Sequence, residues 1–350
     1  MPDPRAISMG TERLPAQGGF SFGDTVDRDV RRLTPNHHLS LDTLEETRFW
    51  PAADRDFTDG VESVDDAAAA LAERMGVVCN ALIDDAPAWF ALSGGLDSRM
   101  LLAAAEHGFG PNTRLYSHGM NRASFLDTIA AERIADHLGR EIRIVIPEGS
   151  PMKDMRSPEA QRHGALHHNI SAGFVAPVGA HLNRGALDWI PRDDLLIRGN
   201  MLELASAIWW PGVHKIDRVD PVAITTPEQA EDRAARMRGW IAALPENAAR
   251  VVHDFNYIEN TLPYAQAGLM SMNHCLFITP ACDRRVFELC MAVPFPARRR
   301  KKFFRRILKA SRPDLRALST TKDVAEERRA RWPSALSSRF YDWTTGNAPA

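Results

Sequence analysis

The sequence predicts an α/β domain built on a parallel sheet with helices on both faces, followed by a mainly helical C-terminal region. Three apolar segments of strand length, at 88–92, 113–119 and 141–147, alternate with segments of helical spacing. Strands and helices that alternate at this pace form parallel pairs joined by right-handed crossovers. After Pro151 the pattern becomes more helical.

Two helical stretches accompany the first strand. Residues 61–83 carry apolar side chains at helical spacing, which predicts a helix that precedes the first strand in the sequence. Residues 98–107 predict a second helix directly after the strand, and Gly108 is placed to cap its C-terminal end.

The later helices have recognisable start and stop signals. A capping-box-like pair, Ser124 and Asp127, predicts the start of the third helix, and Gly139 predicts its end. In the C-terminal region, Thr226 and Pro227 supply a cap and a first-turn proline. Helices are predicted behind them at 228–244, and also at 283–293 and 302–311.

The charge balance excludes several classes of partner. With 43 Lys and Arg against 45 Asp and Glu in 350 residues, the formal net charge is −2, so no global field would attract nucleic acid or acidic lipid. No apolar run approaches the roughly 20 residues of a membrane span, and the N-terminal residues lack the pattern of a secretory signal. We therefore expect a cytoplasmic protein without a nucleic-acid or membrane partner.

Cysteines and paired histidines offer no metal site in the sequence. The cysteines contain no C-x-x-C pair, which predicts free buried thiols rather than disulfides or a structural zinc. They are Cys79, Cys275, Cys282 and Cys290. The adjacent pairs His37–His38 and His167–His168 lack ligand spacing, so ordinary surface or core histidines are expected.

A polar loop links the first strand to its helix. Its residues are Leu92, Ser93, Gly94, Gly95, Leu96, Asp97 and Ser98. In a parallel sheet, ligands bind beyond the carboxyl ends of the strands, where this loop lies. The two glycines let an anion approach backbone N–H groups, the two serines add hydroxyl donors, and the positive end of the helix dipole points to the same place. The loop therefore predicts a phosphate-binding site.

Asp97 gives this loop its particular chemistry. A carboxylate repels a phosphate, so its expected role is to hold a Mg²⁺ that bridges phosphate oxygens. A Walker A loop would carry Lys before Ser or Thr, whereas this sequence has Asp97-Ser98. The alternative interpretation is a strand-to-helix turn with an Asp or Ser cap, but such a cap requires one of these residues rather than the whole set.

The motif SGGLDS resembles the pyrophosphate loop of the ATP pyrophosphatases, whose fold is that of the adenine nucleotide alpha hydrolases. Its surroundings resemble the synthetase domain of the asparagine synthetase family, which includes β-lactam synthetases and macrolactam-forming peptide cyclases. Four further stretches are similar to family elements: 33–51, 116–139, 277–290, with Pro280 and Asp283 before a helix, and 301–315, with Lys301, Arg305 and Pro313 at the family spacing.

This resemblance implies a reaction in two steps: ATP and Mg²⁺ adenylate a carboxylate with release of pyrophosphate, and an amine or ammonia then displaces AMP. It implies that Lys301, Arg305 and Asp97 act in catalysis, with Lys302 as the neighbouring alternative to Lys301. It also implies that the end of the second strand, at Ser117, His118 and Met120, holds adenine largely through backbone groups.

A second family element aligns with residues 197–206. Gly199 matches its first glycine, and Glu203 falls where an Asp helps to bind Mg²⁺. Asn200 replaces a Glu linked to handling of the incoming amine, and Asn cannot accept a proton as a base. The resemblance therefore implies that the acceptor chemistry is altered or lost, and it argues against asparagine itself as the product.

The N-terminal region also departs from the family. Glutamine-using members begin with a catalytic Cys on a long N-terminal glutaminase domain, whereas this chain has Pro2 after the initiator Met. Either the amine is then the substrate's own or free ammonia, or a separate ammonia-supplying or biosynthetic partner provides it, or the chain is a truncated paralogue. The acid is expected to be a small carboxylate or a peptide side chain.

The expected domains follow from this comparison. Residues 1–32 are expected to be disordered, and 33–84 to form a connector remnant and a helix. Residues 85–345 form the expected synthetase domain, with a nucleotide-binding core at 85–150 and a helical substrate region at 151–345.

Four further interpretations stay open or are disfavoured. Asp127 either caps its helix or contacts the nucleotide, and Arg99 is either a ligand contact or an ordinary surface arginine. A tRNA-modifying enzyme would carry a net basic charge and an RNA-binding module, and neither is found. The alternative function is a catalytically altered nucleotide-binding paralogue or synthetase subunit, as Asn200 and the missing N-terminal domain suggest.

Overall fold

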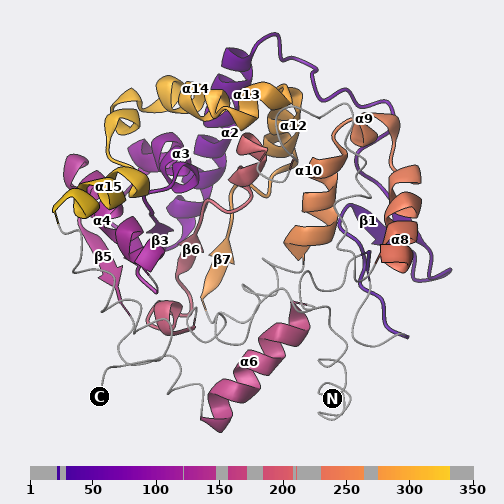
Figure 1. Cartoon of the computed structure of the whole chain (residues 1–350), viewed down its shortest axis with the longest axis horizontal. Coiled ribbons are helices and arrows are strands. Elements are labelled where there is room, and N and C mark those ends of the chain that lie inside the picture. Colours follow the sequence, from indigo (N-terminus) through magenta and orange to yellow (C-terminus); the bar gives the residue numbers. More distant parts are fainter. Residues whose placement is uncertain are drawn as a thin grey trace. The chain divides into compact units, whose positions relative to one another are not determined.

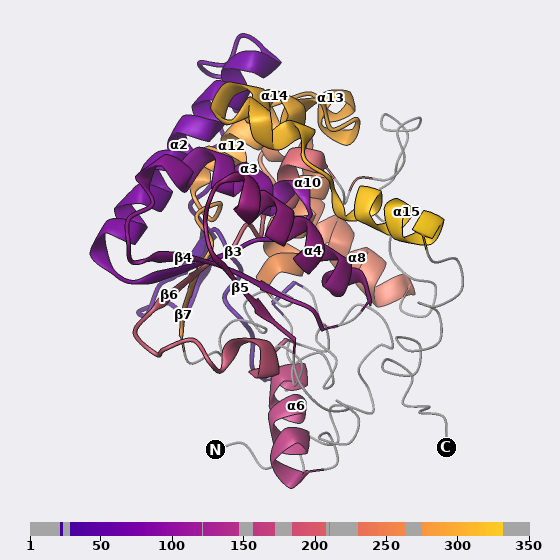
Figure 2. The same ribbon diagram turned by 90° about the vertical axis from the view of Figure 1, so that its left-hand side faces the viewer.

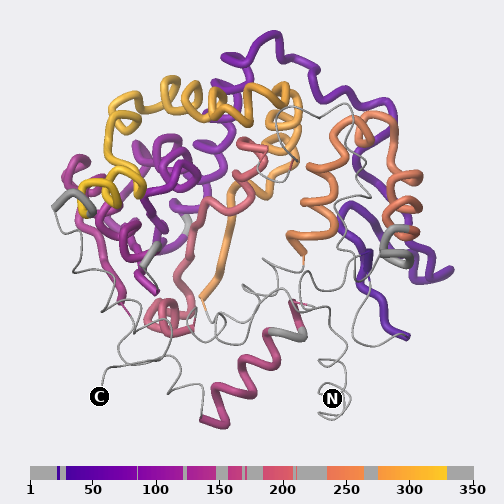
Figure 3. The backbone as a smooth tube through the Cα atoms, viewed as in Figure 1, coloured from indigo at the N-terminus to yellow at the C-terminus, as the bar shows by residue number. Residues whose placement is uncertain are grey.

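The computed structural model describes residues 22–23, 29–120, 122–146, 157–171, 184–207, 210, 230–263 and 275–331 (Figures 1 and 3). By their contacts, residues fall into two compact units. The first draws its residues from 1–59, 161–180 and 207–272, and the second from 60–160, 181–206 and 273–350. Most of the disorder expected at 1–32 concerns positions outside the described residues. The domain boundaries inferred from the sequence stay a prediction.

The second unit is built on a five-stranded parallel sheet in the order β5-β4-β3-β6-β7. The strands are β3 (Ala88–Ala91), β4 (Thr113–His118), β5 (Ile142–Val145), β6 (Leu195–Ile197) and β7 (Leu276–Ile278). The chain leaves central β3 toward β4 and β5, and later returns to the other side of β3 to add β6 and β7. The point where the strand order reverses therefore lies between β3 and β6, and such a switch point is where open α/β sheets bind ligands.

Each face of this sheet is covered by other parts of the chain. Side chains alternate along a strand, so Trp89 of β3 and Leu196 of β6 share one face, where they pack against Leu187 and Ile190. Phe90 points to the opposite face and is fully buried. Helix α3 connects β3 to β4, and α4 connects β4 to β5. Figure 2 shows both helices on one side of the sheet, as expected for two successive right-handed crossovers that add strands on the same side of β3.

The remaining elements of the second unit are mostly helices. They are α2 (Val64–Asp85), α3 (Leu96–Ala105), a 3₁₀ turn (Glu106–Gly108), α4 (Arg122–His137), a 3₁₀ turn (Leu202–Ser206), α12 (Arg284–Ala292), α13 (Phe295–Arg299), α14 (Lys302–Ser311), a 3₁₀ turn (Pro313–Ala317) and α15 (Thr321–Arg331). Helix α2 packs against α3, α12 and α14, and α15 packs against α4. The fold class predicted from the sequence is thereby confirmed.

Two of the predicted helix limits are wrong. Helix α4 begins at Arg122 rather than Ser124, so Ser124 and Asp127 lie inside its first turns instead of capping it. Helix α3 ends at Ala105, and Gly108 is not its cap. A Cβ at Gly108 would collide with the side chain of Asn80, so close packing is what requires glycine there. Gly139 does follow α4 with a left-handed φ of +63°, as predicted.

The first unit joins a small hairpin to helices from late in the sequence. Its elements are β1 (His37–Leu39) and β2 (Glu46–Arg48), which pair antiparallel, most of α6 (Pro158–Ile170), α8 (Ala230–Ala242), α9 (Glu246–Ala249), α10 (Val252–Asn256) and a π-helical turn (Tyr257–Thr261). The predicted helix at 228–244 is represented by α8, and its first residues lie outside the described ones. Trp50, Phe57 and Phe255 form an aromatic cluster in this unit, with ring centroids of Trp50 and Phe255 5.2 Å apart.

The prediction of free, buried thiols is confirmed in part. All four cysteines are free, but only Cys79, Cys275 and Cys290 are buried, and Cys282 is exposed, so burial was wrongly predicted for it. Within the described part of the chain, no helix has both the length and the apolar character to cross a membrane.

A buried ion pair ties the hairpin of the first unit to its helices. The Glu259 carboxylate is 1% exposed and accepts two hydrogen bonds from the Arg48 guanidinium. It also accepts hydrogen bonds from Asn36 Nδ2 and Trp240 Nε1, each at 2.9 Å. Every donor thus converges on one charge, and removal of that charge leaves Arg48 without its partner.

We therefore predict that Glu259→Gln lowers the free energy of unfolding by about 3 kcal/mol, because breaking a buried ion pair leaves an uncompensated charge. Urea denaturation monitored by circular dichroism measures the loss. The matched control is Glu246→Gln, which breaks an exposed pair with Arg250 in the same unit and should cost less than about 1 kcal/mol. Equal losses in the two variants would contradict the assigned role of Glu259.

Candidate functional site

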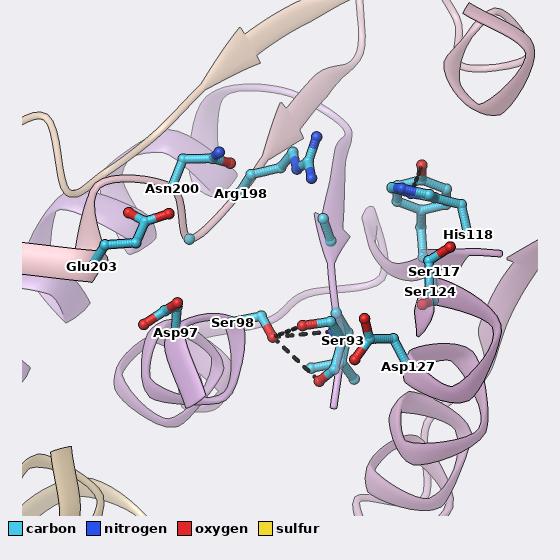
Figure 4. A pocket seen from close by; sticks show the side chains of 14 residues that line it. Ser93, Asp97, Ser98, Ser117, His118, Ser124, Asp127, Arg198, Asn200 and Glu203 are labelled. Carbon is cyan, nitrogen blue, oxygen red and sulfur yellow. Dashed lines mark hydrogen bonds between the residues drawn. The ribbon is translucent and has the colours of Figure 1, made fainter. Parts of the chain in front are cut away.

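A polar cavity of about 240 Å³ lies at the carboxyl ends of the central strands of the second unit. Figure 4 shows the side chains that surround it. Its lining residues come from β3 and the following loop, from α3 and α4, from the end of β4, and from the turn after β6. They are Ala91, Leu92, Ser93, Asp97, Ser98, Tyr116, Ser117, His118, Ser124, Asp127, Arg198, Gly199, Asn200 and Glu203.

The two serines of the loop close it on itself. Ser98 Oγ accepts a hydrogen bond from the Ser93 N–H at 3.0 Å and lies 2.9 Å from Ser93 Oγ. Ser93 Oγ in turn accepts a hydrogen bond from the Gly95 N–H at 3.2 Å. Gly95 is the N-cap residue of α3, and no side chain caps this helix end. The alternative of an Asp or Ser cap is therefore wrong, and the start of α3 keeps backbone N–H groups for other acceptors.

The glycines of the site allow close packing of backbone. A Cβ at Gly94 would lie 2.6 Å from Ala130 Cβ of α4 and 2.8 Å from the Thr321 backbone N of α15. A Cβ at Gly199 would lie 3.1 Å from the Asp97 carbonyl group and the Ser98 N. Gly94 thus lets two helices hold the loop, and Gly199 lets the turn after β6 approach the start of α3.

Asp97 lies in the first turn of α3, and the charge of Glu203 acts on it. Figure 4 shows their carboxylates on the same side of the cavity, one from α3 and one from the 3₁₀ turn after β6. Burial and the charge of Glu203 raise the pKa of Asp97 to about 7, while the charge of Lys301 lowers it. The structure therefore brings together three residues that are far apart in the sequence, and the carboxylate pair favours a positively charged ligand.

Lys301 lies at the start of α14. It occupies the N-cap position with a left-handed backbone, φ 57° and ψ 22°, and its side chain is exposed. Arg305 lies one turn further along α14, is also exposed, and donates its backbone N–H to the Lys301 carbonyl. Neither residue lines the cavity. The positive charge of Lys301 lowers the pKa of Asp97, a residue that does line the cavity. The charges of Arg305 and Lys302 are not among the causes of the pKa shift of Asp97.

The end of β4 forms the opposite wall. Ser117 and His118 line the cavity, as their predicted place requires. Burial lowers the pKa of His118 to about 3, and the charge of Arg198 contributes, so this imidazole is neutral at pH 7. The Tyr116 hydroxyl lies within hydrogen-bond distance of His118 Nδ1. Met120 is not among the lining residues: its N–H donates to Ser124 Oγ and its side chain packs against the core.

Asp127 holds the loop in place. Its carboxylate accepts a hydrogen bond from the Thr321 hydroxyl and another from the Gly94 N–H. Burial raises the pKa of Asp127, and both hydrogen bonds lower it. The capping role considered for Asp127 is wrong, because the residue lies inside α4 and stabilises the loop instead.

Arg99 is neither a surface arginine nor a cavity residue. Its side chain is 0% exposed and donates to the carbonyl groups of Leu315, Leu318 and Ser319 at 2.8–3.0 Å. These carbonyls lie at the end of the 3₁₀ turn after α14 and in the connection to α15. Both interpretations from the sequence are therefore wrong, because Arg99 fastens this connection to α3.

Arg198 is a cavity residue that sequence analysis did not single out. It follows the apolar strand β6 directly, in the sequence Leu-Leu-Ile-Arg. Its backbone is fixed, since its N–H donates to the Ile278 carbonyl and its own carbonyl accepts from Thr279 Oγ1. A cation directly after a buried strand was the available signal, but β6 has only three residues and was not recognised as a strand.

A parallel sheet with a polar cavity at its switch point is typical of α/β proteins that bind small ligands. Residues 76–164 match the family model described as asparagine synthase. This part of the chain is therefore similar to the synthetase domain of the asparagine synthase family, which is a family of ATP-dependent amide ligases. The matched residues include β3, the loop 93–98, α3, β4, α4 and β5. No curated protein matches the chain.

The packing around the loop predicts different tolerance at its two glycines. Gly94→Ala should lower the free energy of unfolding by about 1–3 kcal/mol, because the new methyl group would force α4 and α15 away from the loop. Gly95→Ala is the matched control, since its Cβ would meet only Ser93 Oγ, at 3.2 Å. Urea titration of both variants measures the difference. If Gly95→Ala were the more destabilised variant, the packing role of Gly94 would be refuted.

Proposed function

We propose that the chain is an ATP-dependent, AMP- and pyrophosphate-forming amide ligase, which adenylates a carboxylate and transfers it to an amine or ammonia. The observation that carries this proposal is the convergence of Asp97, Glu203 and Lys301 beside the open start of α3. The family match over 76–164 supports the same class of reaction.

The start of α3 suits the pyrophosphate part of ATP. A helix N-terminus without a side-chain cap presents backbone N–H groups and the positive end of the helix dipole. The hydroxyl groups of Ser93 and Ser98 line the same cavity. Base and ribose are then left to the wall formed by Ser117 and His118. The role of Leu92, Leu96 and Met120 in holding the nucleotide stays a prediction.

The residues present fit a magnesium ion. Asp97 and Glu203 are oxygen ligands, and the repulsion that raises the pKa of Asp97 would be relieved by a cation between them. Among the described residues, no three His, Cys, Asp or Glu side chains gather at one point. A pair of carboxylates leaves the other coordination positions to phosphate oxygens and water, as is usual for Mg²⁺ bound together with a nucleotide. When bound, the ion neutralises phosphate charge.

Lys301 supplies the protein's own positive charge for the adenylation step. Attack of a carboxylate on the α-phosphorus breaks the bond to the β-phosphate oxygen, and negative charge grows on the departing pyrophosphate. A lysine held at the N-cap of α14 in a fixed backbone conformation can meet that charge without reorganisation of the main chain. Arg305, one turn away, is proposed to assist from the same helix.

The acceptor half of the site differs in character. The turn after β6 carries Asn200, whose backbone carbonyl accepts a hydrogen bond from Thr279 Oγ1 at 2.7 Å. An amide cannot take a proton from an incoming ammonium group. We therefore propose that the amine arrives already deprotonated, from the acid substrate itself, from free ammonia, or from a separate partner protein.

The proposal is tested by exchange of labelled pyrophosphate into ATP, with Mg²⁺ and a pool of carboxylic acids. Asp97→Asn should abolish exchange. Lys301→Gln should lower the rate about 10²- to 10³-fold, because it removes a charge that acts on the departing group. The matched control is Lys302→Gln, which removes the adjacent exposed lysine and should change the rate by less than about threefold.

Two results would count against this account. Exchange that survives in Asp97→Asn would remove the assigned role of that carboxylate. Tight ATP binding without any exchange would favour the second candidate, a nucleotide-binding paralogue or synthetase subunit, which the replacement at Asn200 motivates.

A further inference from the structure

Arg198 is a permanent cation in the wall of the cavity. Among the described residues that line the cavity, it alone is Lys or Arg. The register pairs Phe90 with Ile197, so the next pair along β3 and β6 is Ala91 and Arg198, and Ala91 pairs with Tyr116 on its other side. Continuation of this register places Arg198, which directly follows β6, and Tyr116 of β4 on either side of Ala91. Because Ala91 is small, it leaves space between the arginine and the tyrosine.

The guanidinium of Arg198 is available to a ligand. Burial lowers the pKa of Arg198, and the nearby Tyr116 and Glu203 raise it. No described residue accepts a hydrogen bond from this guanidinium or forms an ion pair with it, whereas the buried Arg99 and Arg298 both donate to backbone carbonyls. A desolvated guanidinium without a hydrogen-bond acceptor is unfavourable even with the charge of Glu203 nearby, so the complement that it lacks is an anion that enters the cavity.

The position of Arg198 selects the anion. Figure 4 shows Arg198 between Asn200 and Glu203 on one side and His118 on the other. In the proposed function, pyrophosphate lies at the start of α3, beside Asp97, and the base lies toward Ser117 and His118. The ribose and the α-phosphoryl group lie between them, and of these two the α-phosphoryl group is the anion. Three carboxylates also line the cavity, at Asp97, Asp127 and Glu203, so a phosphoryl group there needs a cation fixed to the protein.

We propose that Arg198 binds the α-phosphoryl oxygens of the nucleotide and so holds the AMP moiety after pyrophosphate has left. This inference rests on the proposed function. It assigns to Arg198 a task that neither Lys301 nor the loop 93–98 performs, since both act on the departing pyrophosphate. A planar guanidinium donates two parallel N–H groups, which suits two oxygens of one phosphoryl group.

The test compares AMP with adenosine, which lacks the phosphoryl group, by titration calorimetry on the full chain. Arg198→Gln should weaken AMP binding about 10- to 100-fold, as loss of a charge-assisted bidentate contact predicts, and should leave adenosine within about threefold. Arg198→Lys should recover part of the loss. The matched control is Arg114→Gln, which removes an exposed arginine at the amino end of β4 and should change neither affinity.

Each other outcome overturns the assignment in a distinguishable way. Equal weakening of AMP and adenosine by Arg198→Gln would mean that the arginine only shapes the cavity. Unchanged affinity for both AMP and adenosine in Arg198→Gln would mean that the guanidinium serves another anion, such as the acid substrate. If the unaltered chain binds neither AMP nor adenosine, the proposed function itself fails, and the role of Arg198 fails with it.

Discussion

The repulsion between the carboxylates of Asp97 and Glu203 is the interaction on which the rest of the site depends. Each is supplied by a different segment, and their mutual repulsion, added to burial, keeps the pKa of Asp97 near 7. Gly199 makes the approach of these segments feasible, because any side chain there would press on the backbone of Asp97 and Ser98. Lys301 offsets only part of the repulsion from its place at the start of α14. A cation bound with a phosphate ligand completes the balance of charge.

The loop that carries Asp97 is held from several directions. Asp127 and Thr321 fix Gly94, the two serines fix the bend, and Arg99 ties the first turn of α3 to the connection before α15. Helices from the start and the end of the second unit therefore support one short loop. This explains why a residue such as Arg99, which could be expected to bind a ligand, instead stabilises the fold around the loop. The loop is held in shape before any ligand arrives, which lowers the cost of ordering it on binding.

The sequence predicted the elements with strong local signals. The strands at the start of the sheet, α2 and α14 were expected from periodicity, and the loop 93–98 from its composition. Strands β6 and β7 were not, because three-residue strands carry too little pattern and owe their form to pairing with β3 and each other. Because β6 was not recognised as a strand, sequence analysis did not single out Arg198, which directly follows it. The structural roles of Arg99 and Asp127 depend on partners about 200 residues away, which local spacing does not encode.

The central claim is that Asp97 and Glu203 share a divalent cation that accompanies the phosphates of ATP at the start of α3. The most direct measurement is a crystal structure with Mn²⁺ in place of Mg²⁺ and a non-hydrolysable ATP analogue, with the metal located by its anomalous scattering. The account predicts one anomalous peak within coordination distance of both carboxylates, and the β- and γ-phosphates beside residues 93–98. A nucleotide bound elsewhere, or a metal that contacts neither carboxylate, would contradict it.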